Sequence, residues 1–158
     1  MPNMFGAELF GLGDLTEFLE ACDKNEEKLL RKSTLAGGRI ILRSMREKCP
    51  VSKDGNYNHE PGNGKKSLKM KALKPLVKGK QLVIIGPEVG KKAKHDGWYL
   101  RLVENGTSHS APEPFARPAY DENADRAYVK LAEVYNENWG ETVIQDIEDL
   151  GDILMDGD

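Results

Sequence analysis

The chain has 158 residues, of which 39% are hydrophobic and 31% are charged, and its formal net charge is -3. This length fits one domain that buries a single core without disulfides or metals. No apolar run approaches the length of a membrane span, and the N-terminus lacks the pattern of a secretion signal. We expect one domain made in the cytosol, with an arm at 1–11, a core at 12–150 and an acidic tail at 151–158.

The N-terminal half predicts two helices. The segment 13–22 predicts a first helix with Asp14 as a suitable N-cap, and a second helix should run from near Asn25 to about Lys48, where Pro50 ends it. The pair Gly37-Gly38 inside the second helix costs up to about 1 kcal/mol per residue. We expect another backbone to pack closely there and offset this cost.

The middle of the chain predicts a mobile loop and a hairpin. Residues 51–64 lack periodicity and are rich in Gly, Asn and Pro, which is typical of a loop. Residues 67–74 alternate between polar and apolar, and 81–87 form a β-rich apolar run, with Pro75 and Gly79 marking a kink and a turn between them. The two strands should pair in antiparallel fashion, with lysines on one face.

The charges are unevenly distributed along the chain. Ten lysines fall between Lys65 and Lys94 with Glu88 as the single acid, whereas nine acids and no basic residue follow Lys130. Such separation favours head-to-tail contact between copies or contact with differently charged neighbours. The alternative is two solvated faces.

Residues 97–119 connect the hairpin to the C-terminal part of the chain. A short helix should end at Asn105-Gly106. A long helix should follow from Pro114 and continue to about Ile147, and residues 151–158 should fray. These elements predict an α+β fold, in which a small antiparallel sheet packs against two or three helices including a long C-terminal helix.

No motif for chemistry emerges. The three histidines, His59, His95 and His109, have no metal-ligand spacing, and there is no nucleophile elbow or dinucleotide fingerprint. Cys22 and Cys49 should be two reduced, mostly buried thiols. We expect no catalytic residue, no cofactor and no metal.

Two sequence blocks stand out between residues 97 and 119. The first has the form G-[WY]-[YA]-x-x-[LF]-[VL]-E-x-G-T, and the second, after a loop of small residues, has the form x-P-x-P-F-x-R-P-A. The residues that fit these forms are Gly97, Trp98, Tyr99, Leu102, Val103, Glu104, Gly106, Thr107, Pro112, Pro114, Phe115, Arg117, Pro118 and Ala119. In these blocks the chain resembles the tail-completion (neck, or head-tail connector) proteins of long-tailed bacteriophages. The earlier layout matches loosely, so the resemblance covers residues 12–120.

The resemblance implies a non-enzymatic α+β virion protein that assembles as a ring at the head-tail junction. Its implied partners are other copies of itself, head-closure proteins, and tail-terminator or tube proteins, around a channel through which DNA passes without specific binding. We expect the lysine-rich hairpin to face protein neighbours, and the acidic C-terminal segment to lie towards the lumen or a partner ring. A tail-terminator or minor tail protein is the alternative within this class.

Different roles are expected for the residues of the two blocks. Trp98, Leu102, Val103 and Phe115 should be core, while Gly106 and the prolines should shape the backbone. Glu104 and Arg117 are candidates for a charge-assisted pair. Residues 107–113 are the expected contact with a neighbour. The candidate structural and interface residues are Trp98, Tyr99, Leu102, Glu104, Gly106, Thr107, Phe115, Arg117 and Pro118.

Two alternatives come from other classes of protein. The lysines of the hairpin could bind nucleic acid, although no arginine or aromatic residue is interleaved with them for base readout or stacking. A small hydrolase could use Glu104 and Asp121 as acid and base, and it would need a pocket that perturbs these carboxylates.

Overall fold

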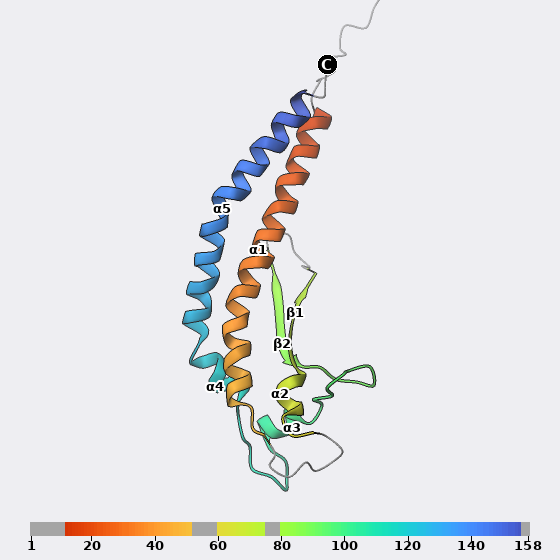
Figure 1. Ribbon diagram of the computed structural model, residues 1–158, viewed down its shortest axis with the longest axis vertical. Coiled ribbons are helices and arrows are strands. Elements are labelled where there is room, and N and C mark those ends of the chain that lie inside the picture. Colours follow the sequence, from red (N-terminus) through yellow and green to blue (C-terminus); the bar gives the residue numbers. More distant parts are fainter. Residues whose placement is uncertain (1–11, 52–59, 75–79, 156–158) are drawn as a thin grey trace, which may run out of the picture.

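The computed structural model of the protein describes residues 12–51, 60–74 and 80–155. The elements in chain order are α1 (Leu12–Lys48), α2 (Asn63–Ser67), β1 (Leu68–Leu73), β2 (Leu82–Pro87), α3 (Leu100–Asn105), α4 (Ala116–Asp121) and α5 (Ala124–Met155). The predicted α+β class is confirmed. The long helices α1 and α5 run side by side, and α1 lies between α5 and the two-stranded sheet (Figure 1).

The N-terminal half is one helix instead of the predicted two. Helix α1 runs without a break through residues 23–25, where we expected a boundary. This stretch contains neither Gly nor Pro, and Asn25 is tolerated inside the helix, where its Oδ1 accepts a hydrogen bond from Lys28 Nζ at 3.1 Å. Helix α5 packs along α1, which favours one uninterrupted helix.

The two central glycines of α1 face different neighbours. A Cβ at Gly37 would lie 2.6 Å from the backbone oxygen of Ala127 in α5, so the expected close backbone approach is confirmed there. A Cβ at Gly38 would instead lie 2.7 Å from Met70 Sδ, on the inner face of the sheet. Helix α1 therefore contacts α5 at one glycine and the sheet at the next.

Strands β1 and β2 form the predicted antiparallel pair, with Leu68 opposite Pro87 and Leu73 opposite Leu82. Along β1 the lysines are exposed and their neighbours are wholly or partly buried, so the predicted alternation is confirmed. The expected turn residues Pro75 and Gly79 lie outside the described residues.

Helix α2 was not predicted, because residues 60–64 were assigned to a loop. The side chain of Asn63 donates to the carbonyl oxygen of Asp96 at 2.8 Å, and Ser67 Oγ donates to the carbonyl of Gly64 at 2.7 Å. Asn63 and Ser67 are both buried. One distant contact, to Asp96, and one local contact within α2 thus stabilise this short helix. The expected mobile segment 52–59 and the arm 1–11 lie outside the described residues.

The C-terminal part is two helices instead of one. Helix α4 ends at Asp121, and α5 begins at Ala124 after a break at Glu122-Asn123. The prediction that the long helix passes Trp139-Gly140 is confirmed, since α5 reaches Met155. Residues 151–155, which we expected to fray, are therefore helical, and 156–158 lie outside the described residues. None of the described helices is long and apolar enough to cross a membrane.

The main core lies where the C-terminal end of α1 meets β1, α3 and α4. Its buried members are Met45, Cys49, Leu68, Leu100, Phe115 and Ala119. The prediction of Phe115 as core is confirmed, but Trp98 and Leu102 are 55% and 38% exposed, so that part is wrong. The buried residue here is Leu100, the first residue of α3.

Neither cysteine forms a disulfide. Cys49 is buried in this core and Cys22 is half-exposed, so only Cys49 fits the expectation of a buried thiol. Burial raises the pKa of Cys49 more than the nearby charge of Lys65 lowers it.

Candidate protein-interaction site

Glu104, at the end of α3, binds the start of α4. Its Oε2 accepts hydrogen bonds from the backbone N–H groups of Phe115 at 2.7 Å and Ala116 at 2.9 Å, and its Oε1 accepts one from Arg117 at 3.1 Å. No side chain of α4 itself caps this terminus. One carboxylate therefore satisfies three N–H groups that a helix start leaves without intrahelical partners.

The hydrogen bonds also set the charge state of Glu104. Burial by itself would raise the pKa of its carboxyl group, but the three backbone N–H groups, helped by the charge of Arg117, bring the pKa below its ordinary value. Hydrogen bonds to a carboxylate favour its ionised form. Glu104 is thus held as an anion at neutral pH.

Glu104 and Arg117 are in contact as expected, but through the backbone of Arg117 and not through its guanidinium group. Their short contact runs through the backbone N–H of Arg117, while the Nη2 atom of the exposed guanidinium points to Asn105 Oδ1 at 3.4 Å. The guanidinium contributes to Glu104 through its charge. Arg117 therefore contacts both of the last two residues of α3.

Gly106 turns the chain out of α3. The helix ends there as predicted, and Gly106 has a φ of 74° and a ψ of 176°, which lies outside the left-handed helical region. Backbone of this kind is almost restricted to glycine. A Cβ here would also lie 2.9 Å from the backbone nitrogen of Pro112. Gly106 lets the loop fold back so that Glu113 can donate its N–H to Val103 O at 2.9 Å.

The loop that follows is a small turn on the surface. The N–H of Thr107 donates to Ser110 O at 2.9 Å, and Thr107 Oγ1 accepts the N–H of His109 at 3.2 Å. Residues 107–114 are all exposed. The segment expected to contact a neighbour is therefore ordered by its own hydrogen bonds and open to solvent.

The remaining predicted residues flank this loop. The rings of Trp98 and Tyr99 meet edge to face with centroids 6.2 Å apart, and Tyr99 is partly buried against α2 near Gly64. Pro118 lies in the first turn of α4, where its missing N–H has no cost. Trp98 and Leu102 are exposed, as are all the residues of the loop.

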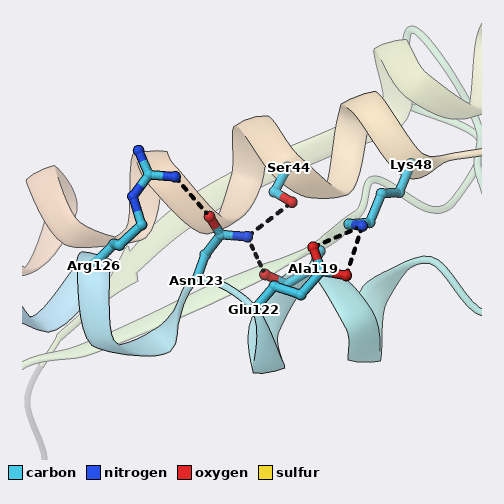
Figure 2. A network of polar contacts seen from close by, with 6 residues as sticks. All are labelled: Ser44, Lys48, Ala119, Glu122, Asn123 and Arg126. Atoms are coloured by element: carbon cyan, nitrogen blue, oxygen red, sulfur yellow. Dashed lines mark hydrogen bonds and ion pairs between the residues drawn. The ribbon is translucent and has the colours of Figure 1, made fainter.

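A second set of polar contacts, which the sequence did not predict, connects the break between α4 and α5 to α1 (Figure 2). Asn123 is buried, and its Nδ2 donates to Ser44 Oγ in α1 at 3.1 Å and to Ala119 O at 3.0 Å. Beside it, Lys48 Nζ lies 2.9 and 2.8 Å from the two carboxylate oxygens of Glu122. An Asn within a helical pattern is a weak signal in sequence, and its partner 79 residues away cannot be found without the fold.

The outer face of the sheet has no covering element among the described residues. Lys71 pairs with Ile84 and Leu73 with Leu82, and residues paired directly share one face. Ile84 and Leu82 are 50% and 54% exposed, next to exposed Lys69 and Lys71. This face, which we call the outer sheet face, combines basic and aliphatic side chains.

Helix α5 carries a surface of the opposite charge. Glu133 and Glu137 are exposed one turn apart, and Val129 and Ile144 are more than half exposed on the same side. We call these four residues the α5 ridge. Lys130 lies beside the ridge and pairs with Glu133 at 3.0 Å.

Comparison of the chain with protein-family models, curated proteins and solved structures finds no match. Its function is therefore inferred from its own geometry. In the part of the chain that the structure describes, no three His, Cys, Asp or Glu side chains lie close enough together to hold a metal ion.

Proposed function

We propose that this protein is a non-enzymatic virion structural subunit that forms a ring at the head-tail junction of a long-tailed phage. There it joins head-closure and tail proteins around the DNA channel. The observation that carries the proposal is the contact between Glu104 and the N–H groups of residues 115–117. It connects the E-x-G-T block directly to the P-F-x-R-P-A block, so the two parts of the motif act as one structural unit.

The lowered pKa and the hydrogen bonds of Glu104 support a structural role for this motif. A general acid at neutral pH needs a pKa raised towards 7, and a general base needs a free lone pair aimed at substrate. The pKa of Glu104 is lowered, and three backbone donors occupy its two oxygens. This argues against the hydrolase alternative, which relied on the same residue.

The placement of charge supports assembly. Helix α1 lies between the sheet, with its exposed lysines, and α5, with its exposed glutamates (Figure 1). Surfaces of opposite sign at different places on one subunit suit head-to-tail contacts, which close into a ring when the rotation between copies permits. A tail-terminator or minor tail protein would use the same surfaces one layer away.

The deciding test is made on virus particles. Disrupting the gene in the phage that encodes the chain should yield DNA-filled heads and separate tails that no longer join, and the chain supplied from a plasmid should restore joining. Cryo-electron microscopy of complete particles should show the chain as a ring at the neck. Normal infectious particles without the protein would contradict the proposal.

One observation favours the nucleic-acid alternative. A groove of about 450 Å³ on α1 and α2 is lined by four basic side chains, Arg39, Arg43, Arg46 and Lys65, together with Leu42 and the acidic Glu47. Two of these already have protein partners, since Arg46 donates to Leu68 O at 2.7 Å and Arg43 pairs with Glu47 at 3.2 Å. Binding of duplex DNA that weakens steeply with salt would support this alternative.

A further inference from the structure

The outer sheet face leaves apolar surface in water on a small protein. The two strands are covered by α1 on one side, where Met70 packs on Gly38, while Leu82 and Ile84 stand on the other side at least half exposed. Exposed aliphatic groups bordered by charged residues are typical of interaction surfaces. The lysines on the same face restrict the partner to a surface that is both apolar and acidic.

The α5 ridge has this composition. Glu133 and Glu137 lie between Val129 and Ile144, so acidic side chains are flanked by aliphatic ones along the exposed side of the helix. Lys130 is bound to Glu133 and leaves Glu137 as the more available acid. The ridge and the outer sheet face therefore match in chemical type and are opposite in charge.

The spacing of the charges also matches. Residues two apart on a strand, such as Lys69 and Lys71, are separated by about 6.6 Å. Residues four apart on a helix, such as Glu133 and Glu137, are separated by about 6 Å along the axis. A helix lying along the strands can therefore place both glutamates next to both lysines, as α1 lies along the inner face of the same sheet (Figure 1).

We propose that the α5 ridge of one copy docks on the outer sheet face of the next copy. The contact is head-to-tail, because α1 separates the two surfaces within one chain and they cannot meet intramolecularly. In the docked pair Lys69 and Lys71 face Glu133 and Glu137, and the aliphatic residues of both surfaces leave water. The inference deepens the ring assembly under "Proposed function" by naming its two surfaces, and it rests on that self-assembly.

Charge reversal and its rescue test the contact on the purified full chain. Lys69→Glu with Lys71→Glu, or Glu133→Lys with Glu137→Lys, should each weaken self-association on the order of tenfold or more in analytical ultracentrifugation at low salt. Mixing the two double variants should restore association, because the reversed sheet of one then meets the reversed ridge of the other. Lys91→Glu with Lys92→Glu is the matched control, with the same charge change in an exposed loop, and should associate like the parent.

A covalent trap gives a second readout. Lys71→Cys combined with Glu137→Cys should form disulfide-linked dimers and longer chains under mild oxidation, whereas either substitution alone should give far less linked material. The native Cys49 is buried and Cys22 is half-exposed, so the single variants also report any linkage through Cys22. Circular dichroism of each variant verifies that the helices remain folded.

The possible outcomes distinguish a failure of the docking contact from a failure of the proposed neck function. A parent chain that stays monomeric at low salt and high concentration would overturn the contact, as would reversals that leave association unchanged. If either result is obtained but a ring is still seen at the virion neck, the proposed function holds and other surfaces form the ring. A contact confirmed in solution, with normal particles made in the absence of the protein, would retain the docking surfaces and reject the neck function.

Discussion

The carboxylate of Glu104 accepts the backbone N–H of Phe115 at 2.7 Å, and the next two N–H groups of the chain donate to the same carboxylate. This contact fixes the start of α4 on the end of α3 and so positions Phe115 in the core. Glu104→Ala should lower the free energy of unfolding by about 1 to 2 kcal/mol, the usual range for losing a helix cap. Urea denaturation measures the change. Glu113→Ala removes an exposed carboxylate of the same loop and should have little effect.

The stabilisation by Glu104 should depend on pH in a definite direction. Its pKa is lowered in the folded protein, so the unfolded state binds more protons around the ordinary pKa of glutamate. The contribution is complete above that ordinary value and is lost as the pH falls through the lower, folded-state pKa. Thermal melts of the parent and Glu104→Gln should therefore differ at pH 7 and converge in acid. An equal difference at every pH would contradict the role assigned to the charge.

The two adjacent glycines of α1 should respond differently to alanine. Gly37→Ala places a Cβ 2.6 Å from a backbone oxygen of α5, and separating the helices should destabilise the protein by about 1 to 3 kcal/mol. Gly38→Ala meets the flexible side chain of Met70, so its gain in helix propensity, about 1 kcal/mol, should offset most of the strain.

Gly140 completes the comparison. A Cβ there has open space around it, so Gly140→Ala should stabilise the protein by about 0.5 to 1 kcal/mol. Denaturant titrations of the three variants rank them, and equal effects at Gly37 and Gly38 would contradict the described packing of α1 on α5.

Gly106 and Gly62 both have positive φ, but only Gly106 is crowded by other atoms. Their alanine variants therefore distinguish the cost of backbone strain from the cost of a steric clash. No atom lies within 4 Å of the place that a Cβ would take at Gly62, so Gly62→Ala should cost about 1 kcal/mol for its left-handed backbone. Gly106→Ala adds a clash with Pro112 and should cost about 3 kcal/mol or more. Differential scanning calorimetry compares the two, and a milder effect at Gly106 would be inconsistent with the close return of the loop.

Asn123 should be hard to replace. Its amide group donates to Ser44 and to the carbonyl of Ala119 inside the protein (Figure 2). Asn123→Asp turns a donor into an anion facing that carbonyl, and we expect a loss of about 2 to 3 kcal/mol. Asn136→Asp, at an exposed position of α5, is the control and should change the melting temperature little. Similar melting temperatures for both variants would contradict the hydrogen bonds described for Asn123.

Leu100 and Trp98 test the position of the core. Leu100→Ala should cost about 2 to 5 kcal/mol because the side chain is buried. Trp98→Ala should cost about 1 kcal/mol or less because most of that residue is exposed. Chemical denaturation of both variants measures the two losses in the free energy of unfolding. A larger loss for Trp98→Ala than for Leu100→Ala would support the sequence prediction that Trp98 is a core residue.

Local patterns in the sequence were sufficient for the two strands, for the short helix before Gly106 and for the presence of long helical segments at both ends of the fold. The alternation of Lys69 and Lys71 with apolar residues predicted β1 and its exposed face, because side chains on a strand alternate strictly. The Gly37-Gly38 pair predicted a close backbone approach, because glycine inside a helix has a cost that contact offsets. The α+β class and the separation of charge along the chain also followed from the sequence alone.

The tertiary structure decided where the helices join and which side chains face inward. The break at Asn123 depends on Ser44, and the start of α4 depends on Glu104, which is 11 residues away from Phe115. The fold places Leu100, the first residue of α3, inside and Trp98, two residues before this helix, outside, although both fit an apolar pattern. Each of these depends on hydrogen bonds or packing between residues far apart in sequence, and such contacts leave no local periodicity to read.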